Sequence, residues 1–128
     1  MKIYNIPQLM AKTSTVAILL TLICTILIAT GQLFFKLGSE KIFGFLSFFN
    51  LLVIFGLFFY AIGAVIYIFA LKRGEVSVIA PLMALNYVWV TLFSMFILKE
   101  TINGLRFLGI ASVVIGVVII GVSGKYDV

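Results

Sequence analysis

Residues 16–35 read VAILLTLICTILIATGQLFF and hold no charged side chain. A run of this length matches the roughly 20 apolar residues that cross a bilayer core about 30 Å thick. Lipid cannot satisfy backbone N–H and C=O groups, so the run is expected to be helical. Comparable apolar runs occupy residues 45–71, 76–98 and 105–123. The sequence therefore predicts an all-α integral membrane protein in which residues 1–128 form a single domain of four transmembrane helices.

The segments between the four runs are short and span residues 37–44, 72–75 and 99–104. Connections of this length make neighbouring helices antiparallel and leave no room for an extramembrane domain between them. The second run is longer than the bilayer core requires, so it is expected to tilt or to begin among the headgroups. Four helices enclose little interior space, and we therefore expect the chain to assemble at least as a dimer.

The overall composition supports a membrane location. Hydrophobic residues make up 64% of the chain, charged residues make up 10%, and the mean hydropathy is +1.33. A soluble domain with a wet surface does not reach these values. Although the net charge is +5, the basic residues are scattered through the predicted loops. This distribution is typical of topology signals and of contacts with anionic lipid, so we predict membrane lipid as a partner and no nucleic acid.

The basic residues divide almost evenly between the two sides of the membrane. The side that holds both termini carries Lys2, Lys12, Lys72, Arg73 and Lys125, and the opposite side carries Lys36, Lys41, Lys99 and Arg106. Because cytoplasmic loops carry the excess of Lys and Arg, this distribution favours a cytoplasmic N-terminus. So small a difference also suits a chain that inserts in both orientations or pairs with an oppositely oriented partner.

All four carboxylates lie outside the apolar runs, at Glu40, Glu75, Glu100 and Asp127. A proton-coupled cation exporter needs a membrane-embedded acid, so this pattern counts against that class of protein. The chain has no histidine and one cysteine, Cys24, which is expected to pack in the interior. We therefore predict no enzyme activity, no cofactor and no metal site.

The first predicted helix has a polar face. Thr21, Thr25, Gln32 and Lys36 lie within an arc of about 60° when each residue turns the helix by 100°. In one interpretation the threonines bond back to their own helix and Lys36 extends to the membrane surface. In the other, the face lines a route for an anionic head group, and Lys36 contacts its phosphate.

Small and aromatic residues share a face of the second predicted helix, at Gly56, Tyr60, Gly63 and Tyr67. This face is either a packing seam, in which the glycines admit a neighbouring backbone, or an aromatic wall that faces a substrate. On the fourth predicted helix, Gly109 and Gly116 are one heptad apart. That spacing predicts a close helix–helix contact, for which we favour the dimer interface.

The third predicted helix holds the most informative polar group of the chain, Asn86. A mid-membrane amide is costly unless its donors and acceptors find partners, so Asn86 is expected to join two helices or to contact substrate. Pro81 either occupies the first turn of this helix or kinks a helix that begins earlier. A stripe of mostly small side chains runs beside Asn86 and Trp89 and consists of Ala80, Ala84, Tyr87, Thr91 and Ser94.

The strings APLMALNYVWVTL (80–92) and ATGQL (29–33), followed by Lys36, carry a family resemblance. They resemble the small four-helix subunits of the undecaprenyl-phosphate aminoarabinose flippase, which belong to the drug/metabolite transporter superfamily. Pro81, Glu100 and the glycines of the fourth run also fit its EamA-like members. The small multidrug resistance transporters are a more distant match, because Ile28 stands where they carry a glutamate.

The resemblance implies a membrane transporter or flippase component that moves an amphipathic, lipid-linked phosphate or sugar substrate across the inner membrane. It implies a homodimer, or a heterodimer with an oppositely oriented four-helix subunit. The alternatives are a small cation or metabolite exporter and a structural subunit that does not itself transport. The resemblance and the helix faces together assign substrate binding to Gln32, Lys36, Tyr60, Asn86 and Trp89, and helix packing or dimerisation to Gly56, Gly63, Gly109 and Gly116.

Overall fold

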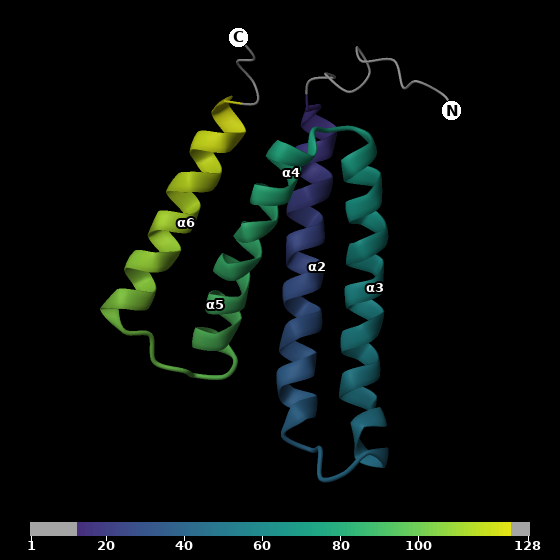
Figure 1. Ribbon diagram of the computed structural model, residues 1–128. Helices are drawn as coiled ribbons and strands as arrows, with labels where there is room; N and C mark the ends of the chain where they lie inside the picture. The colour runs from purple at the N-terminus through teal and green to yellow at the C-terminus, as the bar shows by residue number, and fades with distance from the viewer. Residues whose placement is uncertain (1–12, 124–128) are drawn as a thin grey trace.

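The computed structural model describes residues 13–123, which form four helical spans (Figure 1). Lys2, Lys12, Lys125 and Asp127 lie outside these residues. Each span is long and apolar enough to cross a membrane, so the predicted all-α class with four transmembrane helices is confirmed. The spans are α2 (Thr15–Ser39), α3 (Leu51–Lys72), a third made of α4 (Val76–Leu82), η2 (Met83–Leu85) and α5 (Asn86–Phe96), and α6 (Gly104–Ser123).

The helices α2 and α3 form an antiparallel pair whose backbones approach closely (Figure 1). A Cβ atom at Gly31 would lie 2.8 Å from the Gly56 carbonyl oxygen, and one at Gly63 would lie 2.7 Å from a side-chain carbon of Ile28. The buried Cys24 thiol donates to the Gly63 carbonyl at 3.0 Å. Gly56 and Gly63 therefore lie in a packing seam between the two helices, where a larger side chain has no space.

The second span begins at Leu51, later than its apolar run suggests, because the residues before it form a separate turn. That turn is the 3₁₀ helix η1 (Leu46–Phe49), and Asn50 follows it in an extended conformation. The Asn50 side chain accepts a hydrogen bond from the Val53 N–H and donates to the carbonyls of Gly38 and Ser47. One amide thus caps α3 and joins it to the end of α2.

Replacing this amide tests how much the cap contributes. Asn50→Ala removes three hydrogen bonds, and we expect it to lower the free energy of unfolding by about 2 kcal/mol. Asn103→Ala is the matched control, because Asn103 caps α6 through one bond, to the Arg106 N–H. Its expected cost is about 1 kcal/mol. Detergent-induced unfolding followed by circular dichroism measures both, and an equal loss in the two variants would contradict the prediction.

Pro81 kinks the third span rather than starting it. The helix α4 begins at Val76, Pro81 lies inside it, and the tighter 3₁₀ turn η2 follows before α5 continues the span. Proline has no N–H, so it leaves the carbonyl four residues earlier without its helical partner. The resulting change of winding separates the part of the span that enters the core from the part that lines the cavity described below.

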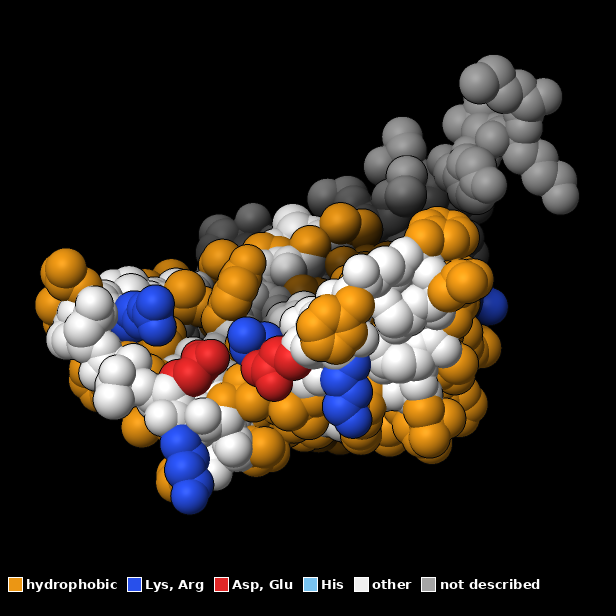
Figure 2. All heavy atoms as spheres, turned by 90° about the horizontal axis from the view of Figure 1, so that it is seen from below, with side chains coloured by type: hydrophobic (Ala, Val, Ile, Leu, Met, Phe, Trp, Pro, Cys, Tyr) orange, Lys and Arg blue, Asp and Glu red, His pale blue; other side chains and the backbone are white. Residues whose placement is uncertain are grey.

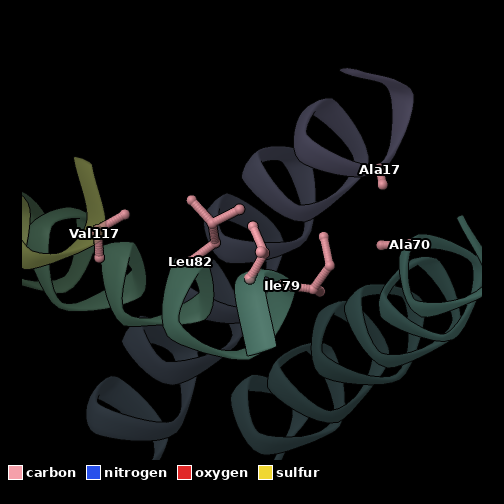
Figure 3. Packing of buried hydrophobic residues seen from close by; sticks show 6 residues of the cluster. Ala17, Ala70, Ile79, Leu82 and Val117 are labelled. Carbon is pink, nitrogen blue, oxygen red and sulfur yellow. The ribbon is translucent and has the colours of Figure 1, made fainter. Parts of the chain in front are cut away.

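The core lies toward the end of the bundle where α2 begins and α6 ends (Figure 3). There Ile79 and Leu82 of α4 pack between Ala17 of α2, Ala70 of α3 and Val117 of α6. Large apolar side chains elsewhere on α3 and α6, such as Phe58 and Ile119, are exposed. An apolar exterior around a small core is the arrangement of a multi-pass membrane protein, because lipid takes the place of water.

Candidate functional site

A cavity of about 370 Å³ lies between α2, α5 and α6, at the end of the bundle opposite the core. Figure 2 shows this end, where basic and acidic side chains gather and hydrophobic side chains surround them. Its apolar walls include Leu33, Phe93 and Ile110. The polar groups that line it are Gln32, Lys36, Thr91, Ser94, Glu100 and Arg106.

Two cations from different helices face the cavity. Lys36 is in the last turn of α2, where its side chain is half exposed and lies 3.7 Å from Glu40 Oε1. Arg106 is in the first turn of α6, close to the Asn103 cap. A cation near a helix N-terminus is disfavoured by the helix dipole, so an anion bound beside Arg106 would be favoured by both the guanidinium and the helix end.

One acid also lines the cavity, at its outer end. After α5 the chain turns back at Lys99, which has a positive φ of 55°, and the Glu100 N–H donates to the Ser94 carbonyl at 3.0 Å. The Ser94 hydroxyl donates to the Glu100 carboxylate. Glu100 is exposed and lies outside the four spans, as do Glu40 and Glu75. The lining of the cavity therefore carries two positive charges and one negative charge.

Gln32 connects the cavity to the third span. Its Oε1 accepts a long hydrogen bond, 3.4 Å, from Nδ2 of Asn86. No donor among residues 13–123 reaches the buried Oδ1 of Asn86. Because the side-chain oxygen of Gln32 accepts the bond from Asn86, the N–H groups of the Gln32 amide are free to donate into the cavity. Asn86 therefore does not line the cavity itself but holds Gln32, which does.

The structure distributes the predicted site residues over several places. Gln32 and Lys36 line the cavity, and Asn86 contacts Gln32. Tyr60 does not reach the cavity because α2 lies between α3 and α5 (Figure 1), and its ring packs 6.1 Å from that of Phe35. Trp89 is half-buried on α5, outside the cavity lining.

The predicted polar face of the first helix divides into two parts. Thr21 and Thr25 are fully buried, and each donates to a carbonyl of its own helix at 2.7 Å. Gln32 and Lys36, about two and three turns beyond Thr25, face the cavity. On α6, a Cβ at Gly109 or Gly116 would meet no atom of the surrounding described chain within 4 Å. Their assignment to a dimer interface stays a prediction.

Sequence reasoning missed Arg106 and Glu100 as site residues and grouped Thr91 and Ser94 only as part of a stripe. Arg106 had one available signal, because it is the single charged residue within the fourth apolar run. Interpreting it as a topology signal concealed its position beside Lys36. Among the described residues, no group of three or more His, Cys, Asp or Glu side chains could hold a metal ion.

A charged cavity open at one end of an apolar four-helix bundle is an arrangement found in small membrane transporters. Comparison with known families agrees with this class: the EamA-like transporter family matches residues 8–122. The chain belongs to that family, which confirms the resemblance drawn from its motifs.

Curated relatives carry a more specific name, probable 4-amino-4-deoxy-L-arabinose-phosphoundecaprenol flippase subunit ArnE. The Pseudomonas fluorescens protein is 34% identical over 64 residues, which cover 50% of this chain and 56% of the relative. The Klebsiella pneumoniae protein is 36% identical over 61 residues, covering 48% and 54%. The chain thus spans about half the length of the curated relatives it matches. No solved structure matches the chain.

Proposed function

We propose that this chain is a component of an inner-membrane flippase whose cavity receives the phosphate of a lipid-linked sugar or a similar amphipathic anion. The observation that carries the proposal is the convergence of Lys36 and Arg106, from two different helices, on one cavity. Family membership and the names of the relatives point in the same direction.

The chemistry of the lining suits a phosphate. Arg106 can form a bidentate pair with phosphate oxygens, and Lys36 supplies a mobile point charge. Gln32, held by Asn86, adds neutral N–H donors on the same side. Apolar side chains such as Leu33 and Ile110 complete the walls, so the charged groups act in a partly desolvated space.

The proposed assembly is a dimer with an oppositely oriented four-helix chain, either identical or related. The cavity opens at one end of the bundle, and an inverted partner would present a second cavity at the other membrane face. We place the N-terminus in the cytoplasm on the basis of the loop charges. The exposed α6 face around Gly116 is the proposed contact with the partner, because small residues allow close approach of helices.

The experiment that tests this function is translocation of a fluorescent polyprenyl-linked sugar phosphate by the purified chain in proteoliposomes. The wild type is expected to accelerate translocation over protein-free vesicles, and Lys36→Ala and Asn86→Ala are each expected to slow it about tenfold. Unchanged rates in both variants would remove these residues from the site. A purified chain without any activity would instead favour the structural-subunit alternative.

Glu100 is the one observation that favours a cation exporter, because it places a carboxylate on the cavity lining. Its exposure and its position outside the spans leave it without the membrane-buried setting that proton exchange requires. We therefore expect a pH gradient to drive no uptake of a quaternary ammonium cation by proteoliposomes. We also expect Glu100→Gln to change lipid-phosphate transport less than threefold. Gradient-driven uptake that Glu100→Gln abolishes would establish the exporter instead.

A further inference from the structure

A second cavity lies along the seam between α5 and α6 and is more open than the first. It has a volume of about 400 Å³ and is lined by Tyr87, Thr91, Arg106, Gly109, Ile110 and Val113. We call it the α5–α6 groove. From Arg106 to Val113 it follows α6 for about 10 Å, from the first turn of the helix toward the middle of the span. It therefore runs from the membrane surface into the apolar depth of the bundle.

The groove lies directly beside the charged cavity. Thr91, Arg106 and Ile110 line both spaces, so a single layer of side chains separates them. Arg106 stands where the two meet, at the end nearest the membrane surface. A molecule with its head group in the charged cavity would reach the groove by extending around Arg106.

The chemistry of the groove differs from that of the cavity. Apart from Arg106 and Thr91, its walls are aliphatic, aromatic or glycine, and the Thr91 hydroxyl already donates to the Tyr87 carbonyl at 2.7 Å. Gly109 keeps the groove open because no neighbouring atom occupies the space where a Cβ would lie. Apart from the Arg106 guanidinium and the Tyr87 hydroxyl, the groove offers no free side-chain polar group, so its walls suit a hydrocarbon chain.

We propose that the α5–α6 groove holds the hydrocarbon tail of the lipid-linked phosphate whose head group enters the charged cavity. This inference rests on the proposed function and adds the route by which the tail stays in the bilayer while the head group binds. The positive charge of Arg106 favours a lipid-linked phosphate over a second copy of the chain as the occupant of the groove. Arg106 has no ion-pair partner among residues 13–123, and an apolar helix laid over the groove would cover its guanidinium without an anion.

The groove would act by giving the tail space, and not by raising the affinity of the protein for the lipid. A tail in the groove contacts apolar side chains in place of other lipid tails, and the two environments are similar in polarity. The groove matters because a head group cannot descend into the cavity while its attached tail has no path beside it. Filling the groove should therefore affect substrates with long tails and spare those without.

Gly109→Leu tests this, since the new side chain would enter the groove and Gly109 does not itself line the charged cavity. Gly121→Leu is the matched control on the same helix, because its Cβ also meets open space in the described chain and Gly121 lines neither cavity. We expect Gly109→Leu to slow transport of a long-chain polyprenyl-linked phosphate about tenfold, with binding of a water-soluble sugar phosphate unchanged. Gly121→Leu should leave both within twofold. Equal transport by the two variants, or loss of sugar-phosphate binding in Gly109→Leu, would overturn the proposal.

Photo-crosslinking of the wild-type chain gives a second readout that does not depend on a variant folding. A polyprenyl phosphate with a diazirine in its tail is expected to label the peptides that contain Tyr87 or Gly109, and one with a diazirine at its head group the peptide that contains Lys36. Head-group labelling with tail adducts confined to α3 would overturn the groove and leave the proposed function intact. No labelling from either probe would overturn both.

The remaining competitor is a second copy of this chain covering the groove. Gly109→Cys, made together with Cys24→Ala, distinguishes the two occupants. If a tail occupies the groove, added polyprenyl phosphate should slow alkylation of the new thiol severalfold, and oxidation should produce no linked dimer. A disulfide-linked dimer formed in membranes through Gly109→Cys would show that a protein partner covers the groove, and it would overturn the inference.

Discussion

Transport of lipid-linked phosphate is expected to fall about a hundredfold when Lys36 and Arg106 are both changed to glutamine. The two cations face one cavity from different helices, so a phosphate between them would accept charge-assisted hydrogen bonds from both. Such bonds contribute about 1.5–3 kcal/mol each, and the exposure of both Lys36 and Arg106 places each share at the lower end. Together they amount to about 3 kcal/mol, which corresponds to about a hundredfold.

The control must remove the same net charge without touching the cavity. Lys41→Gln combined with Lys72→Gln does so, because both lysines are exposed and neither lines the cavity. Initial rates in proteoliposomes should stay within about twofold of wild type, since neither lysine lines the cavity and salt screens exposed charges. A similar loss in both double variants would mean that overall charge, and not the cavity, determines transport.

The second large effect is on stability and concerns Gly31. A Cβ there would lie 2.8 Å from the Gly56 carbonyl oxygen and 3.2 Å from the Tyr60 nitrogen, and neither backbone atom can move without moving α3. Gly31→Val should therefore separate α2 from α3 and cost about 3 kcal/mol or more in the free energy of unfolding. Detergent-induced unfolding of the purified protein measures the change.

Gly121→Val is the matched control for this experiment. It introduces the same β-branched side chain into a helix, but at a position where a Cβ meets open space in the described chain. The change of helix propensity is thus common to both variants, and their difference isolates the steric term. We expect Gly121→Val to alter stability by less than about 1 kcal/mol. Equal destabilisation would show that the close contact of α2 and α3 contributes little.

The fold was predictable because length and hydropathy alone determine transmembrane helices. Residues 16–35 and the three later runs each correspond to a helical span in the structure. Helix boundaries were less predictable, since they depend on local polar contacts. The apolar residues before Asn50 look like part of a span, yet α3 begins at Leu51 because the Asn50 side chain caps the helix there. The sequence allowed Pro81 either to start a helix or to kink one that begins earlier. In the structure the helix begins earlier, and Ile79, two residues before Pro81, packs in the core.

The candidate site was only partly predictable, because helical periodicity shows which residues share a face but not what that face contacts. Gln32 and Lys36 lie on the face of α2 that meets the cavity, whereas Tyr60 belongs to a helix on the other side of α2. Arg106 joins Lys36 only through the tertiary placement of α6, which no local pattern encodes. The interior hydrogen bond between Gln32 and Asn86 likewise links positions 54 residues apart.

The most direct test of an anion-binding cavity compares two ligands that differ only in the presence of the phosphate group. Binding of a short-chain polyprenyl phosphate and of the matching uncharged polyprenol to the purified protein can be measured by titration calorimetry in detergent. We expect the phosphate to bind at least about tenfold more tightly, and this preference to disappear when Lys36 and Arg106 are both changed to glutamine. Equal affinity for the two ligands, or a preference for phosphate that survives in the double variant, would contradict the proposed anion-binding cavity.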